Sequence, residues 1–249
     1  MIRTELKIRS NTPIADSTYE MIFDAPAGLT GNFRPGQFIN IRLEGFFLRR
    51  PISLCDWTDN TISIIYKTVG KGTEEMSRLE AGAAPEVLLP LGNGYCCDSE
   101  EIGERPLLAG GGAGVPPMYA LCRELIAGGA RPTVLLGFRT AGEVFYVNRF
   151  EEMEADLIVT TEDGSRGEKG FVTDVMGELD YSSVFACGPE GMLKAVDEAA
   201  DRDCPGWFSF EERMGCGFGA CMGCSCRTKY GDKRICREGP VLSRREIIW

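Results

Sequence analysis

The sequence contains no histidine among its 249 residues. This absence excludes Rieske-type iron–sulfur ligation, zinc sites built on imidazole, and catalysis by Ser-His or Cys-His pairs. The sequence also has no apolar run near the ~20 residues that a membrane helix needs. Its first residues lack the apolar core of a signal peptide. We therefore expect a cytoplasmic protein without a membrane partner.

Positive charge is also scarce, since 27 Lys and Arg face 37 Asp and Glu, which gives a net charge of −10. Nucleic-acid binding needs clustered basic side chains, so we expect no nucleic-acid partner. Any phosphate site must be local and built from backbone N–H groups with one or two Arg or Lys side chains.

Cysteine, by contrast, is abundant, with 11 residues. The odd number and the expected compartment disfavour a disulfide framework. Five cysteines lie between positions 216 and 236, and the other six are scattered. We interpret five of the scattered ones as small buried hydrophobic residues, namely Cys55, Cys96, Cys97, Cys122 and Cys204.

The clustered cysteines have the spacing C-x4-C-x2-C, followed by a fourth cysteine after eleven intervening residues. This spacing is typical of a plant-type [2Fe–2S] cluster. Interspersed glycines allow a tight loop whose N–H groups point at the anionic cluster. The predicted ligands are Cys216, Cys221, Cys224 and Cys236.

Zinc is the main alternative for these thiols. Structural zinc sites usually combine two C-x2-C units, and only Cys221 and Cys224 have that form. Cys226 offers a further thiol that could replace a ligand, although we interpret it as a bystander.

Residues 1–98 predict a small antiparallel β-barrel. Runs at 5–8, 19–23, 37–41 and 61–66 alternate or cluster apolar residues, and Gly, Pro, Asn and Asp punctuate them. A short helix is expected at 74–79. The barrel carries two segments that can bind a phosphorylated cofactor, 50–53 and 66–73.

These two segments form a possible flavin site. Arg50 can neutralise a pyrophosphate, and the Ser53 hydroxyl can reach a flavin ring nitrogen. The glycine-rich turn opens a helix for which Thr73 is a suitable N-cap. Each segment alone could be an ordinary turn. The candidate residues are Arg50, Pro51, Ile52, Ser53, Tyr66, Lys67, Gly72 and Thr73.

Residues 99–210 alternate strands and helices, which predicts a doubly wound parallel sheet. Strands are expected at 107–109, 133–137, 156–160 and 183–186, with helices at 117–127 and 189–200.

Two strand-to-helix turns of this part can hold a dinucleotide at the carboxyl edge of the sheet. The first departs from the G-x-G-x-x-G fingerprint, because Val115 stands at the last glycine position and no acidic residue follows about 20 residues later. The second could be a mere helix start. The candidates are Gly110, Gly111, Gly112, Gly114, Cys187, Gly188 and Pro189, with Cys187 near the nicotinamide.

The order Arg-Pro-Ile-Ser, Gly-Gly-Gly-x-Gly-x-Pro-Pro and Cys-Gly-Pro resembles the ferredoxin–NAD(P)+ reductase superfamily. The segments 211–224 and 236–241, together with 161–165 and 170–174, resemble the electron-transfer subunits of dihydroorotate dehydrogenase type B. The resemblance implies FAD on the barrel, NAD on the α/β part and the cluster on residues 211–249. Ile52 replaces the usual Tyr of the flavin motif, so an aliphatic group should cover the flavin face.

The resemblance further implies a partner subunit that carries FMN and oxidises dihydroorotate, in a heterotetramer with two copies of each chain. Electrons would pass singly through the cluster to FAD and leave as a hydride to NAD+. A flavin is needed between the two because it handles both one and two electrons.

Two other interpretations stay open. One is the reductase subunit of a related NADH-dependent ferredoxin:NADP+ oxidoreductase or sulfide dehydrogenase, some of which have an Asp ligand in place of one Cys. The other is a non-enzymatic iron–sulfur protein. NADP also remains possible, because Arg139 follows the second α/β strand, where a 2′-phosphate could sit.

Overall fold

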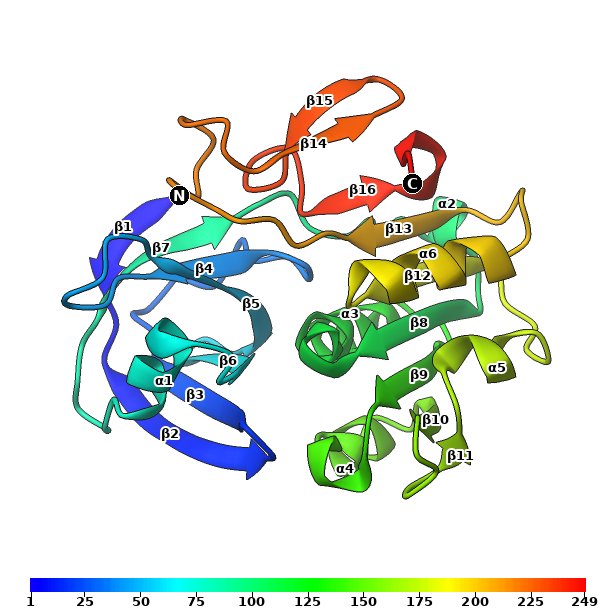
Figure 1. The fold of residues 1–249 in the computed structure, drawn as a ribbon, viewed down its shortest axis with the longest axis horizontal. Coiled ribbons are helices and arrows are strands. Elements are labelled where there is room, and N and C mark those ends of the chain that lie inside the picture. Colours follow the sequence, from blue (N-terminus) through cyan, green and yellow to red (C-terminus); the bar gives the residue numbers. More distant parts are fainter.

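The computed structural model describes residues 1–249. Figure 1 shows three parts, in the order expected from the sequence. A curled sheet lies on the left, a sheet flanked by helices lies on the right, and the C-terminal segment crosses above both.

The first sheet is antiparallel throughout. From edge to edge its strands are β1 (Ile2–Glu5), β7 (Glu86–Leu91), β4 (Phe38–Ile41), β5 (Arg50–Trp57), β6 (Thr61–Lys67), β3 (Thr18–Asp24) and β2 (Ile8–Ala15). The strand expected at 5–8 is wrong, because this stretch joins β1 to β2. Its backbone still pairs with the chain before β7, where Ile8 N donates to Ala83 O at 2.8 Å.

The helix α1 (Lys71–Ser77) packs against the inside of this sheet. Met76 is fully buried in its core, and Asn11 Nδ2 donates to the carbonyl oxygens of Met76 and Leu79, both at 2.9 Å. The helix starts three residues before the predicted position 74. Its N-cap is Gly70 rather than Thr73, because the backbone after β6 turns directly into the helix.

The second sheet is parallel except at its last strand. Its order is β11 (Glu168–Lys169), β10 (Asp156–Thr161), β9 (Thr133–Phe138), β8 (Pro106–Gly111), β12 (Ser183–Cys187), β13 (Gly206–Ser209) and the antiparallel β16 (Val241–Ser243).

Helices cover both faces of this sheet. Leu108 packs on one face with α3 (Val115–Ala127) and α4 (Val147–Glu151), whereas Leu107 packs on the other with α5 (Val172–Met176) and α6 (Glu190–Ala199). Successive strand residues point to opposite faces, so this split follows from strand geometry. The doubly wound architecture is confirmed. Shorter elements are α2 (Ser99–Ile102) and 3₁₀ turns at Gly112–Gly114, Ala141–Glu143 and Arg244–Glu246.

The C-terminal segment has no separate core. It forms the hairpin β14 (Ser225–Thr228) and β15 (Gly231–Arg234), and then adds β16 to the second sheet. Ile235 and Leu242 are buried among residues of both sheets. Asn93 Nδ2 donates to Val241 O at 2.7 Å, which fastens the segment to the end of the barrel.

Polar contacts join the barrel to the α/β part. Lys67 Nζ donates to Glu143 Oε2 at 2.8 Å, Asp16 N donates to Gly142 O at 2.9 Å, and Arg123 pairs with Asp56. These contacts fix the two parts around a shared cleft. Among all the helices, none has the length and apolar character required to cross a membrane.

Candidate functional site

The four cysteines predicted as ligands lie in two pairs. Cys216 N donates to Cys221 Sγ at 3.4 Å, and Ala220 N donates to Cys216 Sγ at 3.2 Å. Cys236 N donates to Cys224 Sγ at 3.4 Å. Cys224 and Cys236 are buried, whereas Cys221 is exposed. The loop therefore presents its first pair to the surface and its second pair to the interior.

The ionisation of these thiols suits a positively charged metal. Burial opposes ionisation of Cys216, but backbone N–H groups from Phe218, Cys221 and Ala220 lower its pKa to about 6. Burial and the neighbouring Cys224 thiol raise the pKa of Cys236 to about 12. Metal coordination deprotonates a thiol outright, so iron would supply the positive charge that stabilises the Cys236 thiolate.

Two pairs of thiols match a cluster with two irons, each of which takes two protein ligands. A single tetrahedral zinc would need the thiols gathered around one point. No three Cys, Asp or Glu side chains converge in that way. The donor set and the N–H groups directed at sulfur therefore fit a [2Fe–2S] cluster better than zinc. Cys226 lies outside the pairs, and its Sγ contacts Arg227 O at 3.7 Å.

The cluster loop lies against β4 of the barrel. Gly217 has a φ of +78°, and a Cβ there would collide with Asn40 Nδ2. Asn40 is 1% exposed, and its Oδ1 has no hydrogen-bond partner. Asn40 is directly opposite Pro51 on β5. One buried side chain thus separates the cluster loop from the strand that carries the flavin motif.

The two flavin segments meet in space. A Cβ at Gly72 would collide with the Arg50 guanidinium, so the two segments are in direct contact here. Arg50 also stacks over the Phe46 ring at 4.8 Å. Pro51, Ile52 and Ser53 follow on β5, each partly exposed. The arrangement leaves a guanidinium at the mouth of the barrel, where a pyrophosphate can bind.

Three residues of the second flavin segment differ from expectation. Tyr66 is 2% exposed and donates from its hydroxyl to Asn11 Oδ1 at 2.9 Å, so its side chain belongs to the barrel core. Thr73 Oγ1 accepts from Val69 N at 2.9 Å and Gly70 N at 3.2 Å, and thereby occupies two of the N–H groups expected to be free. Lys67 lines a different cavity, described next.

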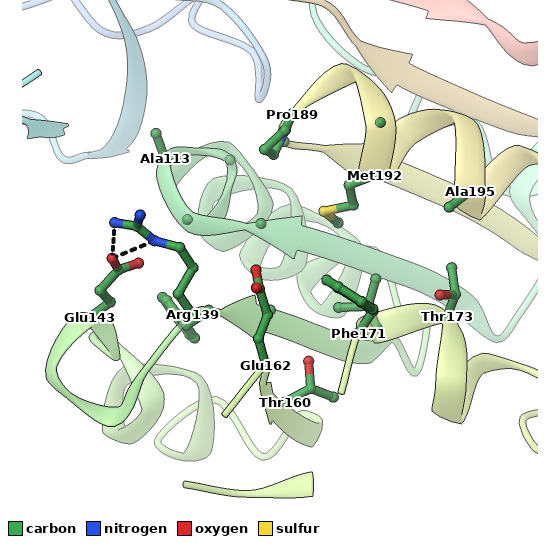
Figure 2. Close-up of a pocket in the computed structure, with 18 of the residues that line it drawn as sticks. Ala113, Arg139, Glu143, Thr160, Glu162, Phe171, Thr173, Pro189, Met192 and Ala195 are labelled. Atoms are coloured by element: carbon green, nitrogen blue, oxygen red, sulfur yellow. Dashed lines mark hydrogen bonds and ion pairs between the residues drawn. The ribbon is translucent and has the colours of Figure 1, made fainter. Parts of the chain in front are cut away.

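A cavity of about 680 Å³ opens at the carboxyl edge of the parallel sheet, in the size range of ligand pockets. Ligands of open α/β sheets bind at this edge. Figure 2 shows the side chains around it, which come from the ends of β9 and β10 and from α5 and α6. The predicted residues that line it are Gly111, Gly112, Gly114, Gly188 and Pro189.

Close packing joins the two predicted turns. A Cβ at Gly114 would overlap the Cys187 carbonyl, and one at Gly111 would collide with Met192 Sδ. Gly110 lies beneath the loop against Val115, outside the cavity lining. The cavity thus forms only because both turns consist of small residues.

Cys187 does not line the cavity. Burial raises the pKa of its thiol to about 12. β12 directs the Cys187 thiol into the core, while the following residues Gly188 and Pro189 form the cavity wall. The position of this thiol beside a nicotinamide stays a prediction.

Sequence reasoning missed a charged cluster in the cavity. Glu143 is 7% exposed and accepts hydrogen bonds from Lys67 Nζ and Arg139 Nε, both at 2.8 Å. Burial opposes ionisation of Glu143, but these two cations lower its pKa. Thr160, another cavity residue, is buried with no partner for its hydroxyl. Lys67 and Glu143 are 76 positions apart, so no local pattern could have linked them.

Comparisons with known proteins agree with this site. Residues 211–248 match the family model described as the iron-sulfur cluster binding domain of dihydroorotate dehydrogenase B, and residues 108–198 match an oxidoreductase NAD-binding domain.

The whole chain is 39% identical to an electron transfer subunit of dihydroorotate dehydrogenase B (NAD(+)) from Geobacillus sp. (strain WCH70) and covers 99% of it. The subunit of that name from Bacillus mycoides (strain KBAB4) is 38% identical, again over 100% of this chain and 99% of its own length.

One similar solved structure is that of an NADH-dependent reduced ferredoxin-NADP oxidoreductase, described for flavin-based electron bifurcation. It has a TM-score of 0.88 at 31% identity, over 98% of this chain and 90% of the other. The predictions of an oxidoreductase with an iron–sulfur binding segment and an NAD-binding domain are confirmed. The full-length matches to curated relatives support the first interpretation of the sequence over both alternatives, and the chain belongs to the family of electron transfer subunits of dihydroorotate dehydrogenase B.

Proposed function

We propose that the chain carries electrons between an FMN-containing dihydroorotate dehydrogenase subunit and NAD+, in pyrimidine biosynthesis. Its family membership supports a role as the electron-transfer subunit of a larger enzyme with a catalytic partner. The cluster would exchange single electrons, and FAD would convert them into a hydride for NAD+. The proposal includes a cytoplasmic enzyme with two copies of each subunit.

The observation that carries this proposal is the position of the cluster loop. It lies against β4, beside the flavin strand β5, and its first cysteine pair faces outward. The nucleotide cavity is at the other side of β5, lined by Lys67 from the adjacent β6 and by the glycine loop. This order supports a path from the outside through the cluster and the barrel to the nucleotide.

We assign the following division of the chain. Residues 1–98 hold FAD, with Arg50 and Gly72 at the pyrophosphate and Pro51, Ile52 and Ser53 along the flavin. Residues 99–210 hold NAD, with the glycine loop at its pyrophosphate. Residues 211–249 hold the cluster on Cys216, Cys221, Cys224 and Cys236.

We propose that the partner docks over the cluster loop. Phe218 is 43% exposed and Met222 is 54% exposed in this loop. Apolar side chains that stay exposed around a redox centre favour a docking surface. A partner there would shield the cluster from water and bring its own flavin close to the outer cysteine pair.

Reconstitution tests the proposal. The isolated chain with FAD and cluster should oxidise NADH with ferricyanide, yet show no dihydroorotate oxidation. Addition of the FMN subunit should create dihydroorotate:NAD+ activity. Dihydroorotate oxidation by the isolated chain would contradict the proposal, because it would place the substrate site on this chain.

The likeness to the NADH-dependent ferredoxin-NADP oxidoreductase structure makes a related reductase the second candidate. The same reconstitution separates the two. A reductase of that kind would exchange electrons with reduced ferredoxin and its own partner, and would give no dihydroorotate-dependent NADH formation with the FMN subunit. The four cysteines favour the first candidate, since no Asp replaces a ligand.

A further inference from the structure

Asn40 is the only polar residue of β4. Ile39 and Ile41 belong to the barrel core, whereas Phe38 is buried in the same core as Cys236, a predicted cluster ligand. Successive residues of a strand point to opposite faces, so Asn40 shares the face of Phe38. Figure 1 shows the segment before β14 crossing over this side of the barrel. The Asn40 side chain therefore points from the barrel toward the cluster loop.

The neighbours of Asn40 in the sheet cannot pair with its amide. Pro51 is opposite on β5 and Leu88 is opposite on β7, and both side chains are apolar. Asn40 is 1% exposed, and its Oδ1 has no hydrogen-bond partner. Burial of an amide without hydrogen bonds is destabilising, and an apolar side chain would be more stable at such a position. The amide therefore indicates a further polar group on this face.

The cluster loop covers this amide. A Cβ at Gly217 would lie 2.1 Å from Asn40 Nδ2, so the amide nitrogen lies directly against the loop next to Cys216. Backbone N–H groups of the loop, among them that of Ala220, are already directed at the Cys216 sulfur. A [2Fe–2S] cluster with four thiolates is anionic, and its sulfur atoms accept hydrogen bonds. Asn40 Nδ2 is thus a side-chain donor beside the place where the loop would hold an anion.

We propose that Asn40 sets the reduction potential of the cluster, by donating a hydrogen bond from Nδ2 to one of its sulfur atoms. Reduction adds a negative charge to the cluster, so this bond stabilises the reduced form more than the oxidised form and raises the potential. A higher potential favours the transfer of an electron from a flavin to the cluster. The inference rests on the proposed cluster and its place in the electron path.

A redox titration monitored by EPR tests this role on the chain loaded with FAD and cluster. Asn40→Leu keeps a side chain of similar shape without a donor, and Asn40→Ala removes the donor together with most of the side chain. The matched control is Leu88→Met. It changes the packing opposite Asn40 on β7 with little change in volume and removes no hydrogen-bonding group.

Both Asn40 variants should have a more negative cluster potential. At a fixed potential near the wild-type midpoint, the ratio of reduced to oxidised cluster should fall about tenfold, which is about 59 mV for one electron. Leu88→Met should titrate like the wild type. The same potential in the wild type and in a cluster-loaded Asn40 variant would overturn the proposal. A shift of equal size in Leu88→Met would also overturn it, because packing alone would then explain the effect.

Iron, sulfide and FAD analysis separates this inference from the proposed function. If the wild type binds no iron and sulfide, the proposed function and this inference both fail. If the wild type binds the cluster and both Asn40 variants retain FAD but lose the cluster, Asn40 only holds the loop, and its role in the potential is overturned. A cluster-loaded variant with an unchanged potential overturns this inference alone and leaves the proposed electron path in place.

Discussion

The cluster loop and the nucleotide cavity differ in how the chain builds them. All four predicted cluster ligands lie between Cys216 and Cys236, and backbone N–H groups of the same loop lower the pKa of Cys216. The cavity instead draws its lining from Lys67 to Glu211, and its charges meet only after the barrel packs on the α/β part. The cluster loop is therefore determined by neighbouring residues in the sequence, whereas the cavity forms only when distant segments pack together.

This difference implies that a mutation in one site should not affect cofactor binding in the other. A change in a cysteine should remove the cluster without a change at the cavity, which is lined by other residues. A change in the cavity should weaken nucleotide binding and leave the cluster in place. The predictions below test this independence, starting with the largest expected effect.

Replacement of Cys224 by Ser should abolish the visible absorbance of the cluster and the EPR signal of its reduced form. Cys224 is 2% exposed and belongs to the inner thiol pair, so no other residue can replace it without movement of the core. The matched control is Cys226→Ser, which should keep both signals. An intact cluster in the Cys224 variant would assign the ligand to another thiol.

Replacement of Gly114 by Ala should weaken nucleotide binding in the cavity and leave the cluster intact. The new Cβ would overlap the backbone carbonyl of Cys187, which cannot move like a flexible side chain. We expect the KM for NADH to rise at least about tenfold, since the loop must shift from the pyrophosphate position. Gly177→Ala is the control, because nothing lies within 4 Å of a Cβ there and the residue does not line the cavity. Loss of cluster absorbance in the Gly114 variant would show that the sites are coupled.

The flavin site can be probed in the same way. Arg50→Ala removes the guanidinium that would face a pyrophosphate, and Gly72→Ala displaces it by collision. Both should lower the affinity for FAD about tenfold or more, the cost of a charged hydrogen bond. Gly70→Ala, with open space around a Cβ, should retain FAD. The FAD content of the purified variants, measured by absorbance after heat release, tests this prediction. Equal FAD content in all variants would show that Arg50 does not bind FAD.

A smaller effect, on the stability of the protein, is expected when the salt bridge between the barrel and the α/β part is removed. Glu143→Gln weakens contacts with Lys67 and Arg139 and should destabilise the protein by about 1–2 kcal/mol at pH 7. The pKa of Glu143 is lower in the folded state, so its contribution is present above the ordinary carboxyl pKa. This contribution to stability is lost only as the pH falls through the lowered pKa of Glu143 in the folded protein.

Chemical denaturation of the wild type and Glu143→Gln at pH 8, 7 and 5 measures this contribution. The difference in unfolding free energy should be constant over that range. Glu152→Gln is the control, since its partner Arg149 lies 4.0 Å away on the surface, and such pairs contribute little. A difference that vanishes between pH 7 and pH 5 would contradict the lowered pKa.

The sequence predicted the parts of the molecule that depend on local patterns. The cysteine spacing indicated four candidate ligands, which the structure brings together in two pairs. Alternation of strands and helices indicated the doubly wound sheet. The predicted helix α3 begins beside the glycine loop, with Pro116 and Pro117 in its first turn. Local rules were sufficient here because neighbouring residues determine these features.

Other features could not be predicted because tertiary packing decides them. Tyr66 and Cys187 are on strands whose alternation directs their side chains into the cores. Lys67 points across the cleft to Glu143. Each of these depends on residues that are distant in sequence and adjacent only in the fold.

Rapid mixing tests the central claim, that electrons between the subunits pass through the cluster loop. NADH is added without oxygen to the wild type and to Cys224→Ser, each in complex with the FMN subunit, and the absorbance of both flavins is followed. The account predicts that the wild type reduces both FAD and FMN, whereas the variant reduces its own FAD and leaves FMN oxidised. Equal rates of FMN reduction in the two complexes would contradict it, because electrons would then reach the partner without the cluster.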